Sequence, residues 1–102
     1  KGTAAAHRAV ATVYAPAAEV AGRLGGPAAG EVEPLDEASC RWHSRPDSLE
    51  WLAVRLTLLG HEFTVHEPAE LTAYLRALGG RASRAAHPGA PAGPAADPEQ
   101  TP

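Results

Sequence analysis

Hydrophobic and polar positions alternate along residues 9–15, where every second side chain is apolar. This period-two pattern is typical of a strand with one buried face, and it puts Thr12 and Tyr14 on the opposite face. Pro16 follows at a position suited to the first turn of a helix. Apolar residues then recur at i, i+3, i+4 and i+7 over residues 17–24, which predicts an amphipathic helix. The sequence Gly25-Gly26-Pro27 should end it, because glycine permits a left-handed cap.

Residues 31–45 predict a hairpin of two strands. The first, over 31–35, is the weaker, and Pro34 should lie at an edge or a bulge because proline has no N–H to donate to a ladder. Residues 36–39 predict the turn. The second strand, 39–45, alternates apolar Cys40 and Trp42 with a basic face made of Arg41, His43 and Arg45.

Two further helices and a fourth strand follow. The second helix begins near Asp47, which with Glu50 forms a capping-box pattern, and Ser48 is an alternative cap. Its apolar stripe includes Leu56, and Gly60 should stop it. A strand over 63–66 comes next, and Pro68 opens a third helix that Gly79-Gly80 is expected to close.

The element order β-α-β-β-α-β plus a terminal helix predicts an α+β, ferredoxin-like fold. We expect a four-stranded antiparallel sheet with the first and third strands in its centre and both main helices on one face. Trp42 and Leu56 should be core residues of this domain, which spans 8–81. Residues 82–102 are expected to form a disordered Pro/Ala-rich tail, because that segment offers too little apolar surface to fold.

Composition narrows the classes of function. A net charge of −3 argues against gripping nucleic acid through phosphate contacts alone. Cys40 is the only cysteine, which excludes an internal disulfide and a multi-thiolate metal site. No apolar run is long enough to span a bilayer, so we expect no membrane partner. The opening residues lack the apolar core of a secretory signal and the thiol is compatible with the cytoplasm, where we expect the chain. The chain has no Met and opens with Lys1-Gly2-Thr3, so we expect a fragment of a longer protein.

No catalytic constellation emerges, and we expect neither enzyme activity nor a bound metal or cofactor. The loop after the first strand lacks the glycines and the arginine with which an acylphosphatase-like enzyme would bind an anion. His61 and His66 should point to opposite faces of their strand and cannot share a metal.

The uncovered sheet face is the better candidate for an effector or docking site, and we assign to it Thr12, Tyr14, Arg41, His43 and Arg45. Reading of single-stranded RNA is not expected there, because only Tyr14 could stack on a base. Three interpretations of this face remain: a patch that binds an anion, a surface that docks a neighbouring domain, and a solvated face without a partner.

Several segments resemble the WCX domain, the C-terminal extension of WYL-domain transcriptional regulators. The similarity covers roughly residues 8–81 and is carried by the sequences ATVYAP at 11–16, DSLEWLA at 47–53, LLG at 58–60 and HEFTVHEPAEL at 61–71. Glu37-Ala38 departs from it, because this family usually has Asp-Gly at the central hairpin.

The resemblance implies a regulator with an N-terminal helix-turn-helix domain, a central WYL domain and this module last. It further implies a homodimer in which the module assists assembly and ligand response, and DNA contact only through the missing N-terminal domain. The alternative is a free-standing, ACT-like sensor of small molecules or a protein-interaction domain. Its ligand loop would have to be Gly25-Gly26.

Overall fold

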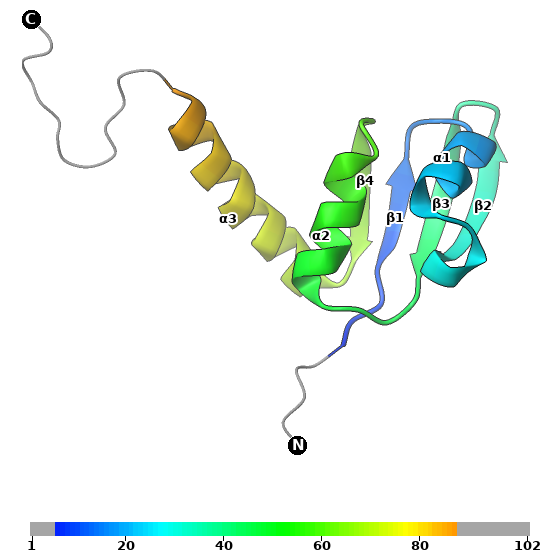
Figure 1. Cartoon of the computed structure of the whole chain (residues 1–102), viewed down its shortest axis with the longest axis horizontal. Helices are drawn as coiled ribbons and strands as arrows, with labels where there is room; N and C mark the ends of the chain where they lie inside the picture. Colours follow the sequence, from blue (N-terminus) through cyan, green and yellow to red (C-terminus); the bar gives the residue numbers. More distant parts are fainter. Residues whose placement is uncertain (1–5, 88–102) are drawn as a thin grey trace, which may run out of the picture.

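The computed structural model describes residues 6–87, which form a four-stranded sheet and its helices. In chain order the elements are β1 (Val10–Val13), α1 (Ala17–Leu24), the short 3-10 helix η1 (Pro27–Ala29), β2 (Gly30–Asp36), β3 (Ser39–Ser44), α2 (Leu49–Leu58), β4 (Phe63–Glu67) and α3 (Ala69–Ala86). The strands lie in the order β2-β3-β1-β4, and every neighbouring pair is antiparallel. Helices α1 and α2 cover one face of the sheet (Figure 1). The predicted α+β class and the central position of β1 and β3 are confirmed.

The core lies between the sheet and the two helices. The predicted alternation holds, since Ala11, Val13, Cys40 and Trp42 are fully buried on the face that meets the helices. Trp42 lies opposite Ala11 in the register, so the small alanine leaves room for the large indole. Its Nε1–H donates to the Ala29 carbonyl oxygen at 3.2 Å, which ties η1 to the sheet. Leu56 of α2 is also fully buried, and both core predictions are confirmed.

Helix α1 ends as the sequence predicts. Gly25 has a φ of 93°, and this left-handed residue caps the helix after Leu24. The N–H of Gly26 donates to the Ala21 carbonyl at 3.1 Å. The two glycines therefore satisfy carbonyl groups at the end of the helix.

A bulge in the β2–β3 hairpin decides which side chains of β2 face the core. Pro34 pairs with Cys40 and Asp36 pairs with Ser39, so Leu35 is an extra residue without a partner in the register. The shift places Val32 opposite Trp42 on the core side and Glu33 opposite Arg41 on the other. A regular hairpin from the same turn would have put Glu33 opposite the buried Trp42. The expected position of Pro34, at an edge strand and beside a bulge, is confirmed.

The hairpin turn at Glu37-Ala38 forms without glycine because Asp36 stabilises it. Asp36 Oδ1 accepts hydrogen bonds from the Ala38 N–H at 2.8 Å and from the Ser39 hydroxyl at 2.9 Å. These bonds favour the ionised carboxylate and hold the pKa of Asp36 below its ordinary value. An aspartate side chain thus supplies the turn geometry that Asp-Gly would supply through its backbone.

Helix α2 begins at the alternative cap. Ser48 Oγ accepts a hydrogen bond from the Trp51 N–H at 3.1 Å, which satisfies one of the free donors of the first turn. Asp47 Oδ1 instead accepts from the Ser48 N–H at 2.8 Å. The prediction of a capping box between Asp47 and Glu50 is wrong, because the helix starts one residue later than that pattern assumes.

Replacing Ser48 with alanine should lower the free energy of unfolding by about 1 kcal/mol, because it removes this cap. Urea denaturation followed by circular dichroism measures the change. The matched control is Ser83→Ala, which alters an exposed serine inside α3 and should not lower stability, because alanine is the better helix former. Equal losses in the two variants would show that the Ser48 hydroxyl is not the cap.

Helix α3 runs through Gly79 and Gly80 to Ala86, so the expectation that these glycines close it is wrong. Neither has a positive φ, and the six residues that follow are arginine, alanine and serine, most of which favour helices. The helix ends before His87, whose extended backbone suits a residue that precedes proline. Residues 82–86, expected in the tail, are therefore helical, and residues 88–102 lie outside the described part of the chain.

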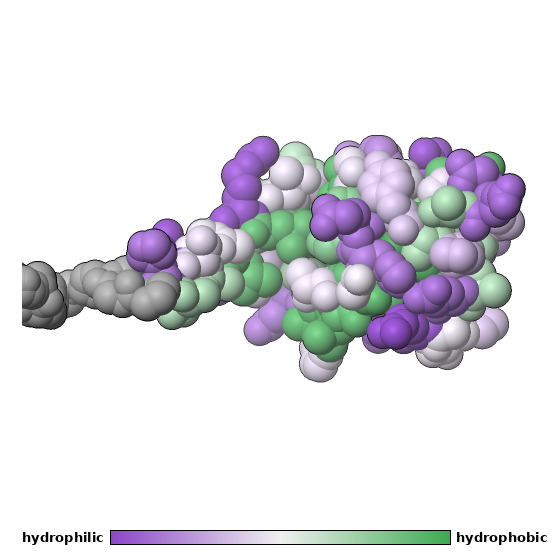
Figure 2. Space-filling model, turned by 90° about the horizontal axis from the view of Figure 1, so that it is seen from above, coloured by the Kyte–Doolittle hydropathy of each residue, from purple (hydrophilic) through white to green (hydrophobic). Residues whose placement is uncertain are grey.

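The first half of α3 packs on α2 and β4, with Leu71 fully buried. The helix then diverges from the rest of the molecule (Figure 1). A shallow hollow of about 420 Å³ lies between β4 and α3, lined by Phe63, Val65 and Leu75 among others. Figure 2 shows apolar surface gathered where α3 leaves the body.

Candidate docking face

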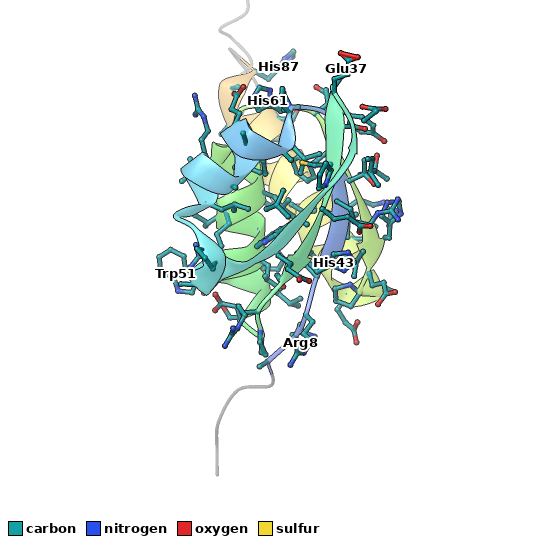
Figure 3. All side chains as sticks on the ribbon, turned by 90° about the vertical axis from the view of Figure 1, so that its right-hand side faces the viewer. Arg8, Glu37, His43, Trp51, His61 and His87 are labelled. Atoms are coloured by element: carbon teal, nitrogen blue, oxygen red, sulfur yellow. The ribbon has the colours of Figure 1, made fainter. Side chains whose placement is uncertain are left out.

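Helices α1 and α2 leave the opposite face of the sheet uncovered, and we call this the open sheet face. The register places two rows of side chains across its four strands: Glu33, Arg41, Thr12 and Thr64 in one, and Glu31, His43, Val10 and Glu67 in the next. His43 lies on this side of the molecule and Trp51 on the helical side (Figure 3). All of the predicted site residues on β1 and β3 thus belong to the uncovered face.

A polar network occupies the centre of the open sheet face. Thr12 Oγ1 lies 2.8 Å from His66 Nε2 and 3.4 Å from Arg41 Nη2, and Thr12 itself is only 6% exposed. Because Val10 pairs with Glu67 and Ala11 pairs with Val65, His66 is an extra residue in a bulge of β4. The bulge brings its imidazole to Thr12. Among the described residues, Arg41 Nε is buried and has no hydrogen-bond partner.

The other predicted residues lie at the two ends of the face and not around one pocket. Tyr14 is half exposed at the end near Cys40, where its hydroxyl lies 3.1 Å from Thr64 Oγ1. Arg45 follows β3 at the opposite end and lines a hollow of about 340 Å³ with Arg8, His43 and Glu31. The sequence therefore identified residues that share a face, while the structure brings only Thr12 and Arg41 of them into direct contact.

Charges on the open sheet face are mixed. His43 Nε2 lies 3.2 Å from Glu33 Oε1, and Glu31 is the register partner of His43. The basic face expected from β3 alone is therefore balanced by the acidic residues of β2. Glu33 reaches this face because of the bulge at Leu35, since a regular hairpin from the same turn would have put it opposite the buried Trp42.

Groups that could carry other chemistry lie apart. Cys40 is fully buried, and this desolvation raises the pKa of its thiol. His61 precedes β4, so the expectation that it shares a strand with His66 is wrong. Its Nε2 lies 2.6 Å from Glu19 Oε2, whereas His66 contacts Thr12. Residues 6–87 contain no group of three His, Cys, Asp or Glu side chains that could hold a metal ion. No helix in that range is long and apolar enough to cross a membrane.

The structure is thus an α+β domain with one helix-covered and one open, polar sheet face. The chain belongs to the WCX domain family, whose model matches residues 5–83. That range takes in every strand and all but the last residues of α3. No curated protein and no solved structure matches the chain.

Proposed function

We propose that this chain is the non-catalytic, C-terminal regulatory and dimer-assembly module of a bacterial WYL-type transcriptional regulator. The match to the WCX domain over residues 5–83 carries the proposal, because this family accompanies WYL domains. The strand order β2-β3-β1-β4 supports a ferredoxin-like architecture for the module. DNA would be read by another domain of the regulator, which is consistent with the net charge of −3 here.

The open sheet face is the surface we assign to the regulatory contact. Arg41 lies at its centre, held by Thr12, and its buried Nε has no partner among residues 6–87. A buried donor without a partner costs free energy, and a carboxylate or carbonyl oxygen from a neighbouring domain would remove that cost. Arginine suits this role because its planar guanidinium can bind such a group with two parallel hydrogen bonds.

In this proposal the module works by a shift between two packings. The open sheet face contacts the WYL domain or the dimer mate in one state and is released in the other. An effector that binds one state more tightly changes the balance, and DNA affinity changes with it. The coupling requires only that the contact differ between the two states.

The double variant Arg41→Glu with Arg45→Glu tests the assignment in the full-length regulator. The chain should stay folded, because Arg41 is part-exposed and Arg45 is exposed beyond the end of β3, and such charges contribute no more than about 1 kcal/mol each. DNA affinity is measured with and without the effector. The ratio of these two affinities should fall by at least about fivefold, which is the lower end of typical allosteric coupling. The matched control, Arg81→Glu with Arg84→Glu, makes the same charge change on exposed α3 positions and should respond as the wild type does. An unchanged response in both variants would remove the open sheet face from the mechanism.

A further inference from the structure

The helical side of the molecule carries an exposed apolar surface that the proposed function does not use. Trp51 is 57% exposed and Leu58 is 73% exposed, although both are large hydrophobic residues. They lie seven residues apart on α2, with Val54 between them, so all three share one side of the helix. Trp51 lies on the side of the molecule opposite to His43 (Figure 3). This surface is therefore separate from the open sheet face.

A hollow of about 210 Å³ separates α1 from α2 beside these residues, and we call it the helix groove. Its lining consists of Arg23, Leu24, Trp51, Val54, Arg55, Leu58 and Leu59. Leu24 and Leu59 are almost fully buried and form its apolar base. Sites for small molecules usually measure about 300–1,000 Å³, so the helix groove is better sized for one or two apolar side chains of a protein.

The charge around the helix groove favours an acidic occupant. Its lining includes two arginines and no carboxylate, in a chain whose net charge is −3. Arg23 Nε lies 3.9 Å from Glu19 Oε2, and Arg55 Nε lies 3.8 Å from Asp47 Oδ2. Both distances exceed that of a hydrogen bond, and both arginine side chains are more than one-third exposed. Each arginine can therefore also bind a carboxylate from outside.

The same charges disfavour a second copy of the chain as the occupant. A two-fold contact through the helix groove would bring the same patch of both copies together. The arginines of both copies would then be gathered at one interface, and like charges across an interface oppose association.

We propose that the helix groove docks an acidic amphipathic helix of a partner protein. One large apolar side chain of that helix enters between Trp51 and Leu58, and flanking carboxylates pair with Arg23 and Arg55. This inference does not rest on the open sheet face. An experiment can therefore contradict the proposal for one surface without contradicting the proposal for the other.

A pair of synthetic helical peptides tests the proposal on the 102-residue chain. The probe has leucine at i, i+3, i+4 and i+7 with glutamate on both flanks, and the comparison peptide has lysine in place of every glutamate. Trp42 is fully buried, so a change in tryptophan emission on binding reports Trp51. We expect the glutamate peptide to cause a saturable blue shift with a Kd on the order of 10–100 µM, and the lysine peptide to bind at least tenfold more weakly.

Three variants locate the binding. Leu58→Ser and Arg55→Glu should each weaken the glutamate peptide at least tenfold, about 1.4 kcal/mol. The matched control is Leu35→Ser, which removes an exposed leucine from β2 and should bind as the wild type does. Absence of binding, equal binding of the two peptides, or an equal loss in the control would overturn the proposal. A blue shift on concentrating the chain alone, lost in Leu58→Ser, would also overturn it, because the occupant would then be a second copy.

Discussion

Replacing Trp42 with alanine should lower the free energy of unfolding by about 3–5 kcal/mol. The side chain is fully buried at the centre of the sheet–helix interface, and its removal leaves a cavity among Ala11, Leu52 and the other core residues. A domain of this size has a total stability of roughly 5–10 kcal/mol, so the variant should be largely destabilised at physiological temperature. Urea denaturation with circular dichroism at several temperatures measures the loss.

The two tryptophans of the chain provide the control for this prediction. Trp51→Ala removes the same side chain from a position that is 57% exposed, and it should cost less than about 1 kcal/mol. Trp42→Phe should fall between the two, because it keeps most of the packing and loses the hydrogen bond to Ala29. A similar cost for Trp42→Ala and Trp51→Ala would contradict the assignment of Trp42 to the core.

Replacing Gly30 with alanine should cost about 3 kcal/mol or more, although it adds only one methyl group. Gly30 begins β2 with a φ of +126°, a conformation that residues with a side chain rarely adopt. A Cβ there would lie 2.2 Å from the His43 carbonyl oxygen and 2.8 Å from Ser44 Cα. Both are backbone atoms of β3, so the clash can be relieved only by moving the two strands apart.

Gly22→Ala is the matched control for this substitution. Gly22 lies within α1, where an added Cβ meets no atom within 4 Å, and it has no positive φ. Alanine should stabilise the chain there by about 0.5–1 kcal/mol, because glycine is the poorer helix former. The two variants should therefore change the urea midpoint in opposite directions. A Gly30→Ala variant as stable as the wild type would show that β2 does not approach β3 as closely as described.

The elements of the fold could be predicted because each has a local signal. Alternation identified β1 and β3, and apolar spacing identified the buried side of α2, with Leu56 in the core. The exact end of α3 could not be predicted. Gly79-Gly80 resembles a stop signal, but glycine only lowers helix stability, and the arginines and alanines that follow outweigh that cost.

The composition of the open sheet face could be predicted only in part. Thr12 and Arg41 lie on neighbouring central strands, and the expected topology already placed them on one face. The contacts of His66 with Thr12 and of His43 with Glu33 depend on bulges at His66 and Leu35. A bulge shifts the register by one residue, and its position is set by packing between strands that are distant in sequence. Pro34 indicated an edge or a bulge on β2, but no pattern within a single strand gives the residue at which the register shifts.

Thiol labelling in the proposed full-length regulator tests most directly whether the open sheet face is a contact surface. Cys40 is fully buried and should not react, so a cysteine introduced at the exposed Thr64 reports the edge strand β4 of that face, next to Thr12. Glu37→Cys, at the exposed tip of the β2–β3 hairpin, is the control (Figure 3). We expect alkylation at position 64 to be at least about tenfold slower in the full-length regulator than in this chain alone, with position 37 unchanged. Equal rates at position 64 in the two proteins, with or without effector, would contradict the proposed role of the open sheet face.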